Sequence, residues 1–340
     1  MKTVASRVFI AMIISSFGLL SSNAQNTSLR GKIEIDGSST VYPISEAAAS
    51  GFNKSYSNVQ INVGVSGTGG GFKRFTKGET DISDASRPIK DSEFAACKQT
   101  GVSFFELPVA YDGLTLVVHK ANTWVDHLTL DEIRKIFTTA GGAKTWADVR
   151  SGWPEKTIQI FAPGTDSGTF DYFKEVVVGK SDTSLRSDMS TSEDDNVLVT
   201  GVSGSPNAIG FFGVAYYEEN KDKLKSVAVV NPTTGEKVSP TATTIEDGSY
   251  APFSRPLFIY VNAKSFQRSE VRQFVAYYLR QAPAMAKQTG YVALPASIYT
   301  QCMMRCRDSK NGVGTHYLTN SMEKRSGAVT QVYRKENLVD

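Results

Sequence analysis

The amino-acid sequence predicts an α/β fold arranged in two domains. Short apolar strands alternate with helical segments along most of the 340-residue chain. This alternation is typical of domains in which helices cover mostly parallel sheets. A chain of this length can bury two separate cores, and it shows no repeat with a period of roughly 20–50 residues that would indicate a solenoid.

Apolar residues in alternation or in short continuous runs predict the strands. The predicted strands are residues 32–36, 59–66, 104–119, 157–162, 208–213, 226–230 and 256–262. Helical spacing of apolar residues predicts helices at residues 44–56, 72–78, 129–137, 170–178 and 269–281. Thr129 and Ser269 are expected to cap two of these helices, because hydroxyl oxygens accept hydrogen bonds from the unpaired N–H groups.

The two ends of the chain differ from the rest. Lys2 and Arg7 precede the apolar run VFIAMIISSFGLL, and the small residues that follow it, up to Ala24, offer a cleavage site. This pattern is typical of an export signal. The run is short for a membrane span, and no cysteine lies near the cleavage point. We therefore predict a signal peptide at residues 1–24, a periplasmic location and no lipid anchor. Residues 311–340 are polar and weakly periodic, and we expect a C-terminal extension there.

Charge and composition exclude several classes of partner. Loss of Lys2 and Arg7 with the signal peptide lowers the formal net charge from +3 to +1. A nearly neutral chain has no broad field for nucleic acid or membrane, so any attraction for an anion must be local. Three cysteines and three scattered histidines indicate neither a disulfide framework nor a zinc site. We predict no cofactor and no metal.

Three loops share one composition. Each follows a predicted strand, precedes a helix and holds hydroxyl side chains and glycines: residues 37–40 (GSST), 66–71 (SGTGGG) and 163–169 (PGTDSGT). Helix N-termini have unpaired N–H groups and a positive dipole end, and glycines let the backbone approach a ligand. Capping alone explains any one loop, but three at the carboxyl ends of strands predict one oxyanion site. Neither nucleotide-binding glycine motif is present.

A fourth stretch, DISDASRPIK, supplies a positive charge. Arg87 follows a predicted strand end, and Pro88 stiffens the backbone beside it. Arginine can donate two parallel hydrogen bonds to a tetrahedral oxyanion. A surface arginine without a ligand is the alternative interpretation.

The ordered motifs DGSSTVYPI, SGTGGGFKRF, DISDASRPI and GTDSGTFDYF, followed by GVSGSPNAIGFFGVAYY, resemble those of the periplasmic phosphate-binding proteins of phosphate ABC transporters. The resemblance implies a type II periplasmic binding protein, a clamp of two α/β domains with two hinge crossings. We expect domain I at residues 25–108 and 256–310, domain II at 109–255, and crossings near residues 104–112 and 254–261.

The resemblance also implies the residues that bind phosphate. By their positions in the motifs these are Ser39, Thr40, Val41, Thr68, Ser167, Gly168 and Thr169. The chain departs from the family pattern in its charges. Arg87 stands where the best-known members carry an Asp, and Pro163 stands where they carry an Arg, while Asp166 precedes Ser167. We interpret this as an exchange of charges across the cleft, which adds Arg87 and Asp166 to the predicted site.

The expected function of Asp166 follows from the protonation of the ligand. Phosphate carries a proton near neutral pH, and a carboxylate can accept its hydrogen bond. Sulfate carries no proton, so it would face the carboxylate with unpaired charge and be rejected. Asp166 could instead orient Arg87 or cap the helix.

The leading functional prediction is a monomeric binding protein that delivers inorganic phosphate to an inner-membrane ABC permease. A receptor for another tetrahedral oxyanion, arsenate or sulfate, is one alternative. A phosphatase is another, but it needs an activated nucleophile or clustered metal ligands. No histidine lies in the four motifs, and we expect the acidic stretch 192–196 to be a solvated loop or part of the cleft rim rather than a metal site. We therefore predict no catalytic residues.

Overall fold

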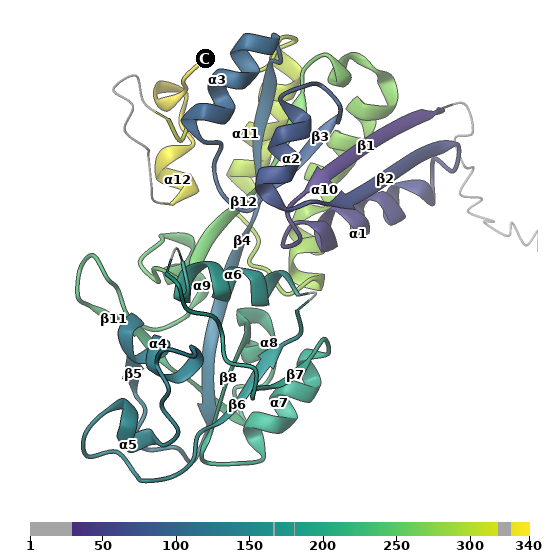
Figure 1. Cartoon of the computed structure of the whole chain (residues 1–340). Helices are drawn as coiled ribbons and strands as arrows, with labels where there is room; N and C mark the ends of the chain where they lie inside the picture. The colour runs from purple at the N-terminus through teal and green to yellow at the C-terminus, as the bar shows by residue number, and fades with distance from the viewer. Residues whose placement is uncertain (1–28, 166, 180, 319–327) are drawn as a thin grey trace, which may run out of the picture.

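The chain folds into two lobes that are joined by a pair of long strands (Figure 1). The structure is a computed structural model that describes residues 29–165, 167–179, 181–318 and 328–340. The predicted signal peptide and Asp166 therefore lie outside the described residues. Within the described part of the chain, no helix is both long and apolar enough to cross a membrane.

One nine-stranded sheet runs through both lobes. Its order is β2-β1-β3-β12-β4-β8-β6-β7, and β9 also pairs with β4. Its strands are β1 (Gly31–Gly37), β2 (Val59–Val65), β3 (Ile82–Ala85), β4 (Phe104–His119), β6 (Gln159–Pro163), β7 (Ser190–Ser192), β8 (Ala208–Gly213), β9 (Leu224–Ser226) and β12 (Ser254–Asn262). A small second sheet is made of β5 (His127–Leu128), β10 (Ala228–Val230) and β11 (Lys237–Val238). The predicted strand at 226–230 is thus divided between β9 and β10.

The two connecting strands make the sheet mixed rather than mostly parallel, which corrects the prediction. Strand β4 pairs with β12 over residues 104–113 and with β8 over residues 114–118, antiparallel in both cases. The physical reason is that one strand carries the chain into the lower lobe and the other returns it, so the two must run in opposite directions. Parallel pairing is kept between β1 and its two neighbours and between β6 and its two neighbours.

Helices cover the sheet in both lobes (Figure 1). They are α1 (Tyr42–Asn53), α2 (Gly67–Phe75), α3 (Asp91–Thr100), α4 (Leu130–Phe137), α5 (Trp146–Val149), α6 (Gly168–Val177), α7 (Asp195–Ser203), α8 (Val214–Glu219), α9 (Ala242–Glu246), α10 (Ser269–Gln288), α11 (Ala296–Asp308) and α12 (Val329–Val332). Two short 3₁₀ helices, Ser265–Gln267 and Lys335–Asn337, complete the set. Thr129 caps α4 as predicted, with a reciprocal contact from Glu132. Ser269 does not cap α10, because it is already the first helical residue and Arg268 occupies the cap position.

The C-terminal residues fold back onto the upper lobe. Glu106 of β4 is fully buried, and its carboxylate accepts hydrogen bonds from the hydroxyl groups of Tyr260 and Thr315 and from the backbone N–H of His316. The Tyr333 hydroxyl donates to the backbone oxygen of Glu106 at 2.6 Å. Residues 315–318 and 328–333 therefore help to complete the core around the first half of β4.

Candidate functional site

The three loops predicted from the sequence lie where strands end and helices begin. Strand β1 ends at Gly37 and α1 begins at Tyr42, β2 ends at Val65 and α2 begins at Gly67, and β6 ends at Pro163 and α6 begins at Gly168. A helix start leaves its first N–H groups unpaired and at the positive end of the dipole. Two lobes therefore present three such ends, with α1 and α2 on the upper lobe and α6 on the lower lobe (Figure 1).

Glycine at two positions allows the upper loops to approach each other. Gly37 has φ of +148°, and a Cβ there would lie 2.1 Å from the backbone oxygen of Asp84. A Cβ on Gly71 would lie 2.6 Å from the Gly37 Cα atom. A side chain at Gly37 would force the end of β1 away from β3, and a side chain at Gly71 would force α2 away from the end of β1. These glycines thus let the first loop, α2 and the end of β3 lie close together.

A cleft of about 290 Å³ lies between the loop before α1, the start of α2 and the first two turns of α6. Its lining is polar and comes from both lobes and from a connecting strand: Ser38, Ser39, Thr40, Gly67, Thr68, Gly69, Ser86, Arg87, Lys90, Asp171, Tyr172, Glu175 and Arg255. Four predicted site residues belong to this lining, namely Ser39, Thr40, Thr68 and Arg87. The structure brings together the cation and the hydroxyl groups that the sequence motifs separate widely along the chain.

The other predicted residues lie beside the cleft in different ways. Val41 is completely buried, and its backbone N–H donates to the Ser38 oxygen at 3.2 Å. Ser167 caps α6, because its hydroxyl oxygen accepts a hydrogen bond from the Thr169 N–H at 3.2 Å. The capping interpretation of this loop is therefore correct for Ser167. Gly168 lies against the opposite lobe.

The lobes touch directly across the cleft. The Ser39 hydroxyl donates to Asp171 Oδ2 at 2.9 Å, and the Thr40 hydroxyl donates to the Gly168 oxygen at 3.3 Å. A Cβ on Gly168 would lie only 2.6 Å from the Thr40 Cα atom. The first loop and the start of α6 are therefore in close contact, and glycine at position 168 is required for it.

Arg87 reaches the cleft but is already paired within its own lobe. Its two terminal nitrogens donate to the two carboxylate oxygens of Glu93, at 2.9 and 2.7 Å. Nearby, the Thr68 and Ser86 hydroxyl groups lie 3.1 Å apart, and the Thr68 hydroxyl oxygen accepts from the Ser86 N–H at 3.2 Å. Arg87 and Thr68 thus belong to one hydrogen-bonded wall of the cleft, formed by α2 and the chain after β3.

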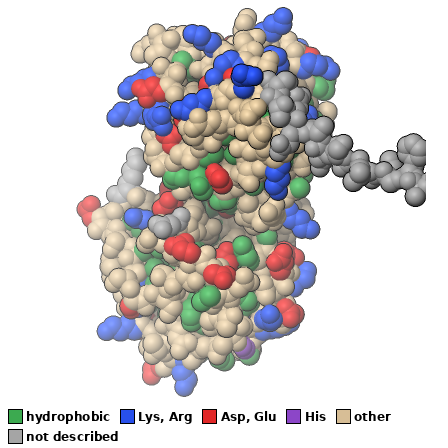
Figure 2. Space-filling model, turned by 90° about the vertical axis from the view of Figure 1, so that its right-hand side faces the viewer, with side chains coloured by type: hydrophobic (Ala, Val, Ile, Leu, Met, Phe, Trp, Pro, Cys, Tyr) green, Lys and Arg blue, Asp and Glu red, His purple; other side chains and the backbone are tan. Residues whose placement is uncertain are grey.

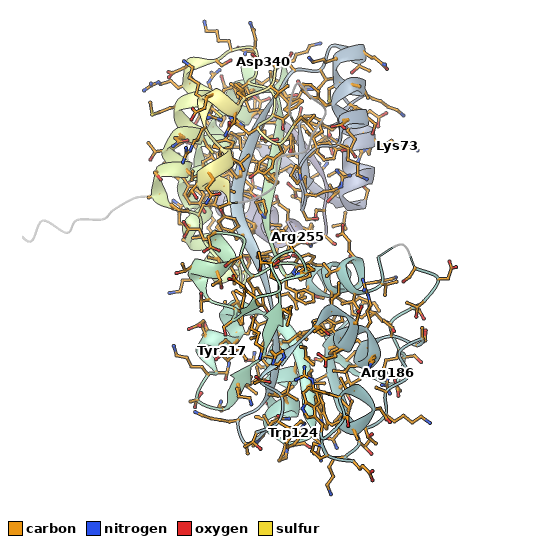
Figure 3. The ribbon with its side chains drawn as sticks, turned by 90° about the vertical axis from the view of Figure 1, so that its left-hand side faces the viewer. Lys73, Trp124, Arg186, Tyr217, Arg255 and Asp340 are labelled. Atoms are coloured by element: carbon orange, nitrogen blue, oxygen red, sulfur yellow. The ribbon has the colours of Figure 1, made fainter. Side chains whose placement is uncertain are left out.

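Sequence reasoning missed Arg255, which lies between the lobes (Figure 3). It stands near the start of β12, and its Nη2 donates to the Thr40 hydroxyl oxygen at 3.1 Å. Its Nε lies 3.3 Å from the buried carboxylate of Asp112 on β4. Burial raises the pKa of Asp112 above its ordinary value, and the guanidinium charge of Arg255 opposes that shift. The sequence did offer a sign of this pair, because Asp112 and Arg255 are charged residues within the two predicted hinge crossings.

The charges around the cleft nearly balance. Three cations, Arg87, Lys90 and Arg255, face two carboxylates, Asp171 and Glu175, which lie on α6. On the face in Figure 2, lysines and arginines gather over the upper lobe, while acidic side chains lie near the constriction between the lobes. An anion in this cleft would therefore meet local donors rather than a broad positive field.

The lining contains no histidine or cysteine. Across the described residues, no group of three or more histidine, cysteine, aspartate or glutamate side chains is placed to hold a metal ion. The three cysteines are free and buried. What the cleft offers is hydroxyl groups, helix starts and guanidinium groups, which are the groups that bind an oxyanion.

A family model described as a PBP superfamily domain matches residues 22–282. The chain belongs to the PBP superfamily. This PBP-superfamily chain is 48% identical over 306 residues to protein SphX of Synechococcus elongatus, with 89% of this chain and 88% of that protein covered. It is 41% identical over 287 residues to the phosphate-binding protein PstS of Staphylococcus saprophyticus, with 84% and 88% covered.

The fold of this PBP-superfamily chain is also found among solved structures. A crystal structure described as a possible phosphate-binding protein from Planctomyces limnophilus matches with a TM-score of 0.79 and 44% identity, and covers 83% of this chain and 99% of that chain. The predicted two-lobed α/β clamp and the resemblance to phosphate-binding proteins are confirmed by these likenesses.

Proposed function

We propose that this protein binds inorganic phosphate in the cleft between its lobes and delivers it to the membrane permease of an ABC transporter. The observation that carries the proposal is the convergence of the first two loops, the first turns of α6 and two arginines on one small polar cleft. The names of the related proteins PstS and the Planctomyces limnophilus structure point to the same ligand. We place the mature protein in the periplasm as a monomer, after removal of residues 1–24.

The ligand would be held by groups from both lobes. The upper lobe offers the hydroxyl groups of Ser39, Thr40 and Thr68 together with Arg87, and the lower lobe offers the start of α6 at residues 167–169. Backbone N–H groups at helix starts and charge-assisted hydrogen bonds from arginine are both favourable for a tetrahedral oxyanion. Val41 would contribute only through its backbone, because its side chain is buried.

Selection of phosphate over sulfate would rest on a carboxylate in the cleft. Asp166, which the sequence indicates, lies outside the described residues. Asp171 is a carboxylate that lines the cleft and already accepts a hydrogen bond from Ser39 across it. A carboxylate in contact with the ligand accepts a hydrogen bond from the protonated oxygen of phosphate, whereas sulfate has no such proton and would face the carboxylate with unpaired charge. Both aspartates are therefore candidates for the discriminating residue.

Calorimetric titration of the mature protein, freed of bound anion, tests the proposal with phosphate, arsenate and sulfate. We expect phosphate to bind in a one-to-one ratio and sulfate to give no measurable heat. Asp166→Asn and Asp171→Asn, made separately, should show which carboxylate excludes sulfate. Absence of phosphate binding by the wild-type protein would overturn the proposal. A phosphate-ester hydrolysis assay should show no turnover, since the cleft lining holds no nucleophile paired with a histidine base.

A further inference from the structure

Arg255 is fixed at the point where both lobes and both connecting strands meet. Its Nε faces Asp112 of β4 at 3.3 Å, and its Nη1 donates to Glu175 of α6 at 3.0 Å. The guanidinium carbon lies 3.5 Å from the ring centre of Tyr172, also on α6. Only 12% of the side chain is exposed. These three contacts hold the plane of the guanidinium group in one orientation.

The contact made by Nη2 is the informative one. Nη2 donates to the hydroxyl oxygen of Thr40 at 3.1 Å, and Thr40 belongs to the first predicted anion loop. A hydroxyl is a neutral acceptor, whereas an oxyanion carries the charge opposite to that of the guanidinium group and can accept two parallel hydrogen bonds from it. An oxyanion beside Thr40 is therefore a better partner for Nη2 than the hydroxyl that it now contacts.

Arg87 is a weaker candidate for the same task. Both of its terminal nitrogens are already bonded to the carboxylate of Glu93, and Nη1 also donates to the backbone oxygen of Pro88 at 3.0 Å. These partners lie in the same lobe as Arg87. Arg87 therefore makes its pair of parallel hydrogen bonds with Glu93 in the wall of the cleft, and these two nitrogens are not free to make the same pair of bonds with an oxyanion.

From this geometry we infer that Arg255 is the principal cation that contacts the bound oxyanion, and that Asp112 is the residue that positions it. This inference rests on the proposed function and names a specificity-determining residue for the same cleft. The buried carboxylate of Asp112 holds Nε from the side of β4, so that the terminal nitrogens face the first loop and α6. The family resemblance alone gives no reason to place a ligand contact at position 255.

The test is calorimetric titration with inorganic phosphate of Arg255→Gln and Arg255→Lys. Arg150→Gln and Arg150→Lys are matched controls, because Arg150 is also bonded to a carboxylate, that of Glu132 at 2.7 Å, and lies 4.4 Å over the ring of Trp153, yet it does not line the cleft. We expect Arg255→Gln to weaken binding roughly 10- to 100-fold, as for one or two lost charge-assisted hydrogen bonds. Arg255→Lys should weaken it by roughly 5-fold, because the charge stays and the planar fork is lost.

Glu175→Gln separates ligand contact from a purely structural role. If Arg255 acted only by tying α6 to the upper lobe, loss of the Glu175 charge would weaken phosphate binding as much as Arg255→Gln does, and that result would overturn the inference. If Arg255 contacts the anion, Glu175→Gln should raise the affinity, because one nitrogen of Arg255 is freed and one negative charge is removed from the cleft lining.

The failure of this inference differs from failure of the proposed function. Wild-type protein that binds phosphate, together with an Arg255→Gln variant of equal affinity, would overturn the inference and leave the function standing. Wild-type protein that does not bind phosphate would remove both. Circular dichroism and the melting temperature without ligand show whether each variant is folded, and Arg255→Lys keeps the test decisive if Arg255→Gln does not fold.

Discussion

Gly168→Ala should block the direct contact between the lobes without harming the fold. The added methyl group would lie 2.6 Å from the Thr40 Cα atom and 2.8 Å from its nitrogen, whereas non-bonded carbon atoms prefer about 3.5–4.0 Å. The lobes would have to separate by about 1 Å at this point. The hydrogen bond from Thr40 to Gly168 is already 3.3 Å long and would be lost, and the same separation would break the 2.9 Å bond from Ser39 to Asp171.

The size of the effect follows from these two bonds. A hydrogen bond contributes about 0.5–1.5 kcal/mol net, so losing both destabilises the arrangement in which the lobes touch by about 1–3 kcal/mol. If phosphate binds to that arrangement, its affinity falls by roughly 5- to 150-fold. The free energy of unfolding should change little, because Gly168 is the first residue of α6 and its backbone is not in the left-handed region, so alanine fits it without strain. Phosphate titration and urea unfolding of the same preparation measure both quantities. Unchanged affinity would refute the assignment of this contact to the ligand-bound state.

Three further substitutions test other parts of the structure. Burial raises the pKa of Asp84 from 3.8 to about 8, so the folded chain holds a proton there that the unfolded chain releases above about pH 4. This group should therefore lower the free energy of unfolding by about 1.4 kcal/mol per pH unit between those two values. Asp84→Asn should remove that slope in urea titrations, and equal slopes would contradict the buried, protonated state. Tyr333→Phe removes the hydroxyl that donates to the buried backbone oxygen of Glu106. It should lower the free energy of unfolding by about 1–3 kcal/mol, as measured by thermal unfolding. No loss would argue against the packing of residues 328–333 onto β4. Thr129→Ala removes a helix cap in the lower lobe and should cost about 1 kcal/mol while phosphate affinity stays constant, and a changed affinity would show that the effect is not local.

The sequence predicts the loops and the extent of both connecting strands well, but not how those strands pair or which distant residues they bring together. The loops at residues 37–40, 66–71 and 163–169 are local, because each follows from a strand end, a helix start and the residues between them. The contact between Arg255 and Thr40 joins positions 215 residues apart, and no periodicity reports on such a pair. The only sign of this contact in the sequence was an arginine next to the apolar strand residues 256–262. An arginine at that position is equally well explained by exposure at the surface, because the sequence does not show what lies next to the strand.

The direction of the strands was wrong for a similar reason. Alternation of strands and helices predicts parallel pairing, and this holds for β1 and β6 with their neighbours. It fails for β4 and β12 because their pairing is fixed by the passage of the chain between lobes, which local composition does not encode. Glu106 and Asp112 interrupt the apolar run 104–119. Because acidic residues in a buried strand need hydrogen-bonding partners, they indicated that other parts of the protein pack against β4.

The continuity of β4 makes the two lobes inseparable as pieces of protein. One half of this 16-residue strand is a central member of the upper part of the sheet, and the other half is a central member of the lower part. If the chain were cut between the lobes, at least one lobe would lose its half of β4. The sheet of that lobe would then lack a central strand, and the neighbouring strands would have unpaired edges. The only register shift between β4 and β12 lies at Leu257/Phe258, so movement of the lobes must bend an intact ladder there. Fusion partners or reporter domains would therefore have to be inserted in outer loops, since no linker joins the halves.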